Sequence, residues 1–321
     1  MKQSSLSSRR DYLKKIGYTA ALPFISACAV EEKPIQEPPI KTDKPKFLFS
    51  LNTSTIKGQQ LGFMEEIEIT AKAGYDAIEI WINGLQKYLE EGGSLQDLNK
   101  KLKALNLEVV NAIGFAQWIV DDENTRNNAL AQLKKEMDML AEIGCKRIAA
   151  PPAGATKEPG LDLNKAGDRF QEILNLGKTT GVIPQLEVWG FSANLNKLSE
   201  VLYVAAEADI ENTRILPDIY HLYKGNSGYN SIHLLNPDAI DIFHLNDVPA
   251  SIDSATIEDK DRVYPGDGIA PINKVLSHLA KGKAPTILSL ELFNPEYWKE
   301  DALSVAEKGL QKMQQLANQI A

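Results

Sequence analysis

Eight short, mostly apolar runs recur along the chain, with helical patterns or loops between them. The runs cover residues 47–51, 77–81, 107–113, 147–150, 182–188, 213–216, 240–243 and 286–290. Runs of this kind, rather than strict alternation, favour strands of a parallel sheet whose outer face is covered. Helical patterns cover residues 62–73, 124–143 and 163–179, and a glycine follows each of them closely, as is typical of helix ends. Eight strand-and-helix units predict an α/β fold, the (β/α)8 TIM barrel, with the helices outside.

Four of these runs end in a side chain that binds metals well: Glu187, Asp218, His244 and Glu291, which are spaced 31, 26 and 47 residues apart. In a TIM barrel the C-terminal ends of all strands meet at one face, so the four side chains should converge there. Carboxylates and an imidazole suit one divalent ion that accepts oxygen and nitrogen, such as Mn²⁺, Mg²⁺, Co²⁺ or Zn²⁺. The spacing therefore predicts a metal site.

The first 28 residues have the features of an export signal. Arg9 and Arg10 form a twin-arginine pattern, and the apolar stretch 16–27 is shorter than the roughly 20 residues that span a bilayer. Ser26-Ala27-Cys28 resembles the site at which a lipoprotein cysteine is acylated, so we expect lipidation of Cys28. An ordinary secretory signal with an incidental cysteine is the alternative. The first interpretation predicts an exported protein of the periplasm or cell envelope.

The charge of the remaining chain restricts its partners. The formal net charge is −8, and removal of residues 1–27 takes away five basic residues and one acidic residue, which leaves −12. Such a chain lacks the basic surface that would attract nucleic acids or anionic membranes. We therefore expect membrane contact only through the lipid. Residues 29–46 are rich in Pro, Glu and Lys and read as a flexible tether. Residues 47–321 have the length of one barrel domain.

The order of the polar residues resembles that of a known superfamily. Asp218 is followed three residues later by His221, and residues 74–79 (GYDAIE) and 265–268 (PGDG) flank the second and seventh strands. With the four strand-end residues, these motifs resemble the sugar phosphate isomerase/epimerase superfamily, the xylose-isomerase-like TIM barrels, over nearly all of residues 47–321. The resemblance implies that all four strand-end residues bind the metal. It also implies that Glu187 and Glu291 act as acid and base and that His221 contacts the substrate. It further suggests a homodimer.

The chemistry of these residue types predicts an enzyme. A divalent ion stabilises the enediolate that forms when a proton leaves the carbon beside a carbonyl, and two carboxylates can remove and return that proton. We expect a metal-dependent isomerase or epimerase acting on a sugar or a sugar-like keto or polyol substrate. A lyase or dehydratase acting by β-elimination on a keto-inositol or a 3-keto glycoside is the first alternative. A non-catalytic sugar-binding lipoprotein is the second, but such a protein needs none of the four ligands.

Five further residues are candidates for substrate binding: Arg262, Asn246, Trp189, Lys224 and Glu79. Arg262 lies in a loop on the predicted catalytic face and either clamps substrate oxygens or forms a surface ion pair with a neighbouring aspartate. Asn246 should point the same way as His244 because side chains alternate along a strand. Trp189 and Lys224 follow strand ends and either line the sugar site or pack against the protein. Glu79 is either near the site or part of a salt bridge at the barrel rim.

Overall fold

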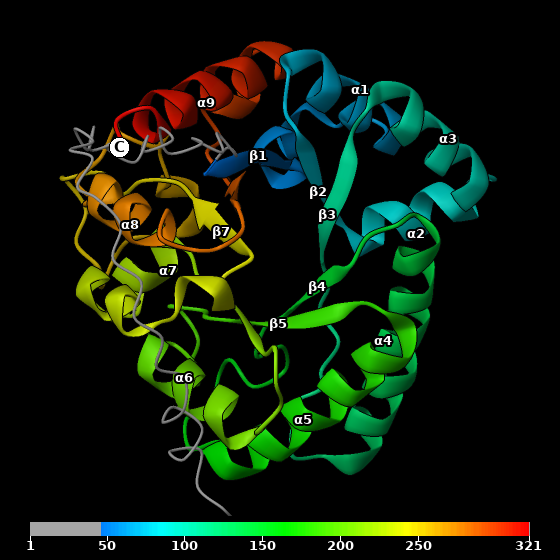
Figure 1. Cartoon of the computed structure of the whole chain (residues 1–321), viewed down its shortest axis with the longest axis vertical. Coiled ribbons are helices and arrows are strands. Elements are labelled where there is room, and N and C mark those ends of the chain that lie inside the picture. The colour runs from blue at the N-terminus through cyan, green and yellow to red at the C-terminus, as the bar shows by residue number, and fades with distance from the viewer. Residues whose placement is uncertain (1–45, 321) are drawn as a thin grey trace, which may run out of the picture. The chain divides into compact units, whose positions relative to one another are not determined.

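The computed structural model describes residues 46–320, in which parallel strands alternate with helices that lie outside them (Figure 1). The strands are β1 (Phe47–Asn52), β2 (Ala77–Trp81), β3 (Glu108–Ile113), β4 (Arg147–Ala150), β5 (Ile183–Glu187), β6 (Arg214–Leu216), β7 (Ile242–Leu245) and β8 (Thr286–Leu290). The α-helices are α1 (Phe63–Ala73), α2 (Ile82–Glu90), α3 (Leu95–Leu105), α4 (Glu123–Glu142), α5 (Leu163–Thr180), α6 (Leu198–Glu207), α7 (Ile219–Lys224), α8 (Ile272–Leu279) and α9 (Ala302–Ala317). Short 3-10 helices are η1 (Thr53–Gln59), η2 (Tyr229–Leu234), η3 (Pro237–Ala239), η4 (Asp259–Asp261) and η5 (Tyr297–Lys299).

The barrel wall consists of two hydrogen-bonded arcs. One sheet has the strand order β3-β2-β1-β8-β7, and the other has the order β4-β5-β6. At the seam between β6 and β7, Asp218 and His244 form an isolated parallel bridge, and the His244 N–H donates to the Pro217 carbonyl at 3.0 Å. At the other seam Arg147 Nη1 donates to the Val110 carbonyl at 3.5 Å. The predicted (β/α)8 barrel is confirmed.

The interior of the barrel has an apolar layer at one level and polar side chains above it. The apolar layer consists of Ala77, Val110, Ile113, Ala149, Leu216, Ile242 and Ile287. Because residues two apart on a strand share a face, Ile242 and Ile287 place His244 and Ser289 inside the barrel, one step closer to its C-terminal face. The strand alternation thus positions the polar site.

Helix ends follow the signals in the sequence. Asp122 and Asp162 cap the N-termini of α4 and α5 through their side chains. Gly74 and Gly181 follow α1 and α5 with φ values of 91° and 78°, a left-handed conformation that glycine adopts without strain. Among residues 46–320, no helix is both long and apolar enough to cross a membrane.

Candidate functional site

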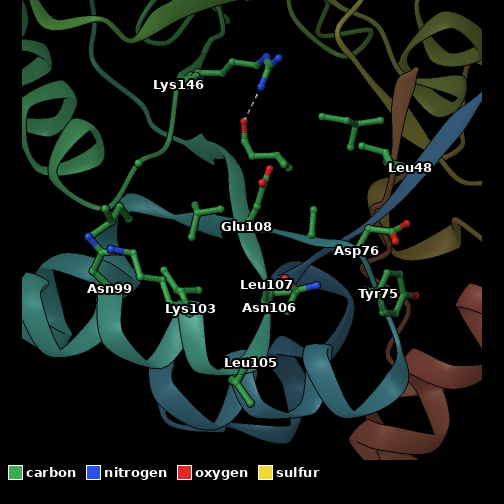
Figure 2. Close-up of a pocket in the computed structure, with 18 of the residues that line it drawn as sticks. Leu48, Tyr75, Asp76, Asn99, Lys103, Leu105, Asn106, Leu107, Glu108 and Lys146 are labelled. Atoms are coloured by element: carbon green, nitrogen blue, oxygen red, sulfur yellow. Dashed lines mark hydrogen bonds between the residues drawn. The ribbon is translucent and has the colours of Figure 1, made fainter. Parts of the chain in front are cut away.

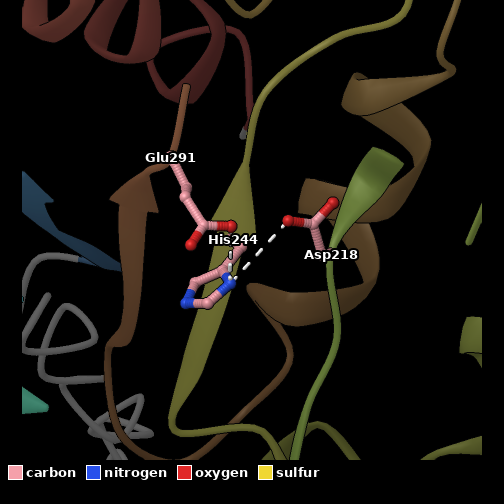
Figure 3. Close-up of side chains that lie close together, drawn as sticks. All are labelled: Asp218, His244 and Glu291. Atoms are coloured by element: carbon pink, nitrogen blue, oxygen red, sulfur yellow. Dashed lines mark ion pairs between the residues drawn. The ribbon is translucent and has the colours of Figure 1, made fainter. Parts of the chain in front are cut away.

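The four predicted metal ligands lie at one end of the barrel. Glu187 is the last residue of β5, and His244 lies within β7. Asp218 caps the N-terminus of α7, where its Oδ1 accepts from the His221 N–H at 3.1 Å, and Glu291 directly follows β8. Figure 3 shows Asp218 and Glu291 on either side of the His244 ring. Two of the four residues come from each arc of the wall.

The distances define a compact group of three with a fourth residue beside it. Asp218, His244 and Glu291 each offer a ligand atom, and these atoms lie within 4.8 Å of one another. His244 Nδ1 lies 3.2 Å from Glu291 Oε2, 3.7 Å from Asp218 Oδ2 and 3.9 Å from Glu187 Oε1. All four side chains are buried, and only the two glutamates keep a few per cent of exposure. Glu187 is thus the more distant member.

Burial and close charges shift the pKa values of this group apart. Burial raises the pKa of Glu187 to about 8, although His244 opposes the shift. Burial also acts to raise the pKa of Glu291, but His244 and Arg262 outweigh it and hold the value at about 2. For His244 burial lowers the pKa, and the carboxylates of Glu291 and Glu79 more than reverse this, so its pKa lies well above 6.5. The site therefore distinguishes its two glutamates.

The donor atoms fit a divalent ion. His244 Nδ1 and Glu187 Oε2 are buried and have no hydrogen-bond partner among the described residues. A buried polar atom without a partner costs free energy, and a metal ion is one way to satisfy both atoms. Two carboxylate oxygens and one imidazole nitrogen already lie close together. Asp218, His244 and Glu291 would hold the ion, with Glu187 completing the set.

Glu79, a predicted substrate-binding candidate, lies behind His244, with its carboxylate occupied by protein groups. Its carboxylate is fully buried and accepts hydrogen bonds from Asn52 Nδ2, Asn111 Nδ2 and Ser289 Oγ at 2.7–2.8 Å. His244 Nε2 lies 3.0 Å from Glu79 Oε1. A carboxylate behind a metal-binding histidine fixes the ring orientation and leaves the other nitrogen to the metal. Glu79 therefore positions His244.

Arg262 reaches the candidate metal ligands. Its Nη1 donates to Glu291 Oε2 at 2.7 Å and to Asp218 Oδ2 at 2.9 Å, and its Nη2 donates to Asp259 at 2.5 Å. The guanidinium is buried against the ring of Tyr220, 4.2 Å from the ring centre. Arg262 thus forms the expected ion pair with a neighbouring aspartate, but the pair is buried rather than on the surface, and the same guanidinium pairs with the site. A clamp on substrate oxygens stays a prediction.

His221 and Asn246 are both buried beside Asp218, but they differ in the hydrogen-bonding groups that remain available to a ligand. His221 Nδ1 accepts from the Gly190 N–H at 3.2 Å, so a neutral ring carries its proton on Nε2. Burial lowers the pKa of His221 to about 3. The Asn246 amide donates to both Asp218 oxygens at 3.1–3.2 Å and accepts from the Tyr220 N–H at 3.0 Å. Asn246 therefore supports Asp218, and a substrate contact of its amide stays a prediction.

Trp189 and Lys224 differ in their position relative to the site. Trp189 is half-buried, lies two residues after Glu187 and packs on the ring of Phe115 with 6.0 Å between the ring centroids, so it borders the site. Lys224 instead donates to the Ala255 carbonyl at 2.9 Å. A substrate contact of Lys224 stays a prediction. The sequence analysis missed the polar residues Asn52, Asn111 and Ser289, although each lies at or near the end of a strand.

A cavity lies at the other end of the barrel. It has a volume of about 1020 Å³ and is lined at the starts of β1 to β4 and β8 by residues such as Leu48, Glu108 and Arg147 (Figure 2). The Arg147 guanidinium donates hydrogen bonds to the Val110 carbonyl and to Asp241. Catalytic sites of TIM barrels lie at the C-terminal face, and the metal-binding side chains lie there in this protein too. We therefore place the functional site at the C-terminal face.

Comparison with known proteins agrees with this geometry. A family model described as xylose isomerase-like TIM barrel matches residues 67–316. The chain belongs to this family. The inosose isomerase of Bacillus subtilis (strain 168) is 27% identical over 254 residues, which cover 76% of this chain and 89% of that protein. A 3-dehydroshikimate dehydratase of Pseudomonas aeruginosa is 23% identical over 256 residues, which cover 78% of this chain and 39% of that protein.

A solved structure shares the fold. The crystal structure of the IolI protein, which has a bound zinc atom, superimposes with a TM-score of 0.78 at 22% identity. The match covers 85% of this chain and 99% of that chain. The barrel is therefore of the xylose isomerase type.

Proposed function

We propose that this protein is a divalent-metal-dependent isomerase or epimerase that acts on a sugar or a sugar-like ketone or polyol. One observation carries the proposal: Glu187 and Glu291 come from different arcs of the barrel and approach the same nitrogen, His244 Nδ1, at 3.9 and 3.2 Å. A substrate carbon between two such carboxylates can lose and regain a proton. The similarity to an inosose isomerase supports this class of substrate.

Each residue of the site has its own role in the proposed proton transfer. A divalent ion held by Asp218, His244 and Glu291, with Glu187, would polarise the ketone oxygen. Glu291 removes the proton from the carbon beside the ketone, and the electron pair of the broken C–H bond moves toward the ketone oxygen. Glu187 then delivers a proton to carbon, and delivery to the opposite face inverts that centre. The free Nε2–H of His221 holds a substrate oxygen.

A β-elimination is the second candidate, and the similarity to a 3-dehydroshikimate dehydratase favours it. The first step is the same removal of a proton beside the ketone. The electron pair then forms a carbon–carbon double bond, and a β-hydroxyl or an aglycone leaves with the pair from its own bond and takes a proton from Glu187. The substrate would be a keto-inositol or a 3-keto glycoside.

NMR spectroscopy in D₂O separates the two reactions. The metal-loaded protein is incubated with free keto-sugars, inososes and 3-keto glucosides. Incorporation of deuterium at carbon with an unchanged skeleton indicates an isomerase or epimerase, and the loss of a leaving group indicates a lyase. No exchange with any of these substrates would contradict the proposal.

We also propose that the protein is exported and anchored in the cell envelope through a lipid on Cys28, and that it forms a homodimer. The twin-arginine pattern and the small residues before Cys28 support export and lipidation. Residues 1–45 lie outside the described part of the chain, so this proposal depends on the sequence alone. The dimer depends on the family resemblance, and sedimentation velocity tests it.

A further inference from the structure

Eight side chains form a closed ring of contacts at the C-terminal face, and we call this ring the collar. In order around the ring they are Trp81, Phe115, Trp189, Phe191, His221, Tyr220, Arg262 and Phe293. Between the aromatic rings the centroid distances are 5.4, 6.0, 5.1, 5.6 and 5.0 Å from Trp81 to Tyr220, and 6.1 Å from Phe293 back to Trp81. Arg262 closes the ring, 4.2 Å from the Tyr220 centroid and 5.0 Å from that of Phe293.

The collar lies at the same end of the barrel as the candidate metal ligands, because its members also lie at or after the C-terminal ends of strands. Trp81 ends β2, Phe115 follows β3 by two residues, and Phe293 follows β8 by three. Polar contacts join it to the site, because Arg262 donates to both Asp218 and Glu291. A substrate held at the ligands would therefore lie beside the collar.

The collar has a polar side and an apolar side. Arg262, Tyr220 and His221 are buried and carry nitrogen and oxygen atoms. On the other side Phe115 and Phe191 are 42% and 45% exposed and present only carbon. Trp189 lies between these two phenyl rings and contacts both. Exposed aromatic groups that gather in one place, unlike single ones, mark a binding surface.

The apolar side does not suit a phosphate or a chain of free hydroxyls. Two phenyl rings offer no hydrogen bond to such groups, and the indole N–H of Trp81 is already used by Asn52 Oδ1 at 2.9 Å. Arg262 is paired with three carboxylates. Lys57 is a cation beside the collar, and its Nζ lies 4.6 Å from the Trp81 ring centre. The surface instead suits a flat apolar group, which stacks on aromatic rings.

We propose that the substrate is a keto-sugar that carries an aryl group as its glycosidic substituent, and that Phe115 and Phe191 stack on this aryl group. The ketone and the hydroxyls of the sugar face the carboxylates and the polar side of the collar. This inference depends on the proposed function, since it names the substrate class of that site, and it favours a 3-keto glycoside over an inosose.

Calorimetric titration of the Mn²⁺-loaded protein with phenyl and methyl 3-keto-β-glucosides tests the inference. We expect the phenyl glycoside to bind about tenfold more tightly than the methyl glycoside. Phe115→Ala combined with Phe191→Ala should bring the ratio of the two affinities close to one. Tyr203→Ala is the matched control, because Tyr203 is an equally exposed aromatic residue (43%) on α6 and outside the collar, and it should leave the ratio unchanged.

Three outcomes would overturn the inference: equal affinity for both glycosides, a preference that persists in the double variant, or no binding of either compound. Tighter binding of a 6-phosphorylated keto-sugar would also overturn it and would point to Lys57. Deuterium exchange is measured separately on the same compounds. A preference for phenyl without exchange would contradict the proposed reaction and leave the aryl-binding surface established.

Discussion

Arg262 Nη1 lies 2.7 Å from Glu291 Oε2, the carboxylate oxygen that also faces His244 Nδ1 at 3.2 Å. The same nitrogen donates to Asp218 Oδ2 at 2.9 Å. One guanidinium thus neutralises two of the carboxylates that would bind the ion. Its Nε has no hydrogen-bond partner among the described residues. A bound metal ion and Arg262 would therefore both interact with the negative charge of Asp218 and Glu291.

Arg262→Gln should therefore bind Mn²⁺ or Zn²⁺ about tenfold more tightly, because a nearby positive charge is removed from a buried site. The metal-free variant should be less stable than wild type, since Asp218 and Glu291 lose their partner, and added metal should restore stability. Calorimetry and thermal unfolding measure the two effects. Arg214→Gln, which removes a guanidinium paired with Asp241 at the N-terminal face, should not change metal affinity. Weaker metal binding by Arg262→Gln would contradict this account.

Glu291→Gln should keep the fold and some metal, because an amide oxygen can still coordinate an ion and accept from Arg262. It should lose carbon–hydrogen exchange, since an amide cannot accept the proton, and loss of a general base costs about 10²–10⁴ in rate. Deuterium exchange by NMR measures this. A rate within a few-fold of wild type would remove Glu291 from the mechanism.

Glu79→Gln should weaken metal binding by about 10–100-fold, the usual effect of losing a carboxylate behind a metal-binding histidine. The amide can accept only part of the hydrogen bonds that the carboxylate receives from Asn52, Asn111 and Ser289. Competition with a fluorescent chelator gives the affinity. Ser289→Ala removes one of these donors and leaves the carboxylate in place, so its effect should be smaller. An equal effect of both variants would argue that packing, not the charge on Glu79, is responsible.

Glu136 predicts a dependence of stability on pH. The residue is 2% exposed, its Oε2 has no partner among the described residues, and burial raises its pKa above 4.5. The folded protein prefers the protonated acid, so this contribution is complete below pH 4.5 and is lost as the pH rises through the raised pKa. Glu136→Gln should gain stability over wild type as the pH rises across that window, and the gain should then level off. Urea unfolding from pH 4 to 8 checks this, with Asp138→Asn as a control for the loss of an exposed charge on α4. A gain that is independent of pH would contradict it.

Export and anchoring can be tested by fractionation of cells. Cys28→Ala should release the protein from membranes as a soluble or unprocessed form. Arg9→Lys combined with Arg10→Lys should block export, because the twin-arginine pattern is removed. Membrane attachment that survives Cys28→Ala would show that Cys28 is not the anchor.

The strands could be predicted closely from sequence because each is a short, mostly apolar run. The run 77–81 is β2 to the residue, and the helix expected at 163–179 is α5, which ends at Thr180. The helices α2 and α3 were missed, since α2 follows β2 without a loop. Strand-end position predicted that Glu187, Asp218, His244 and Glu291 converge.

The roles of the supporting residues could not be predicted in this way. Glu79 and His244 lie 165 positions apart, and alternation along a strand gives the face of a side chain but not its partner across the barrel. Asn246 shares a face with His244 as expected, yet its amide is taken by Asp218. The collar was missed because Phe115 and Phe191 lie in loops, where an aromatic residue in sequence shows no direction.

The division of the barrel wall into two arcs gives the metal a second role. Glu187 and Asp218 follow the strands of one arc, and His244 and Glu291 belong to the other, so an ion bound by all four would join the arcs across the seam between β6 and β7. The ion would then stabilise the closed barrel as well as serve as a cofactor. Chelation should open this seam first, with faster amide hydrogen exchange at β6 and β7 than at β1 and β2, so that activity and closure of the fold would be lost together.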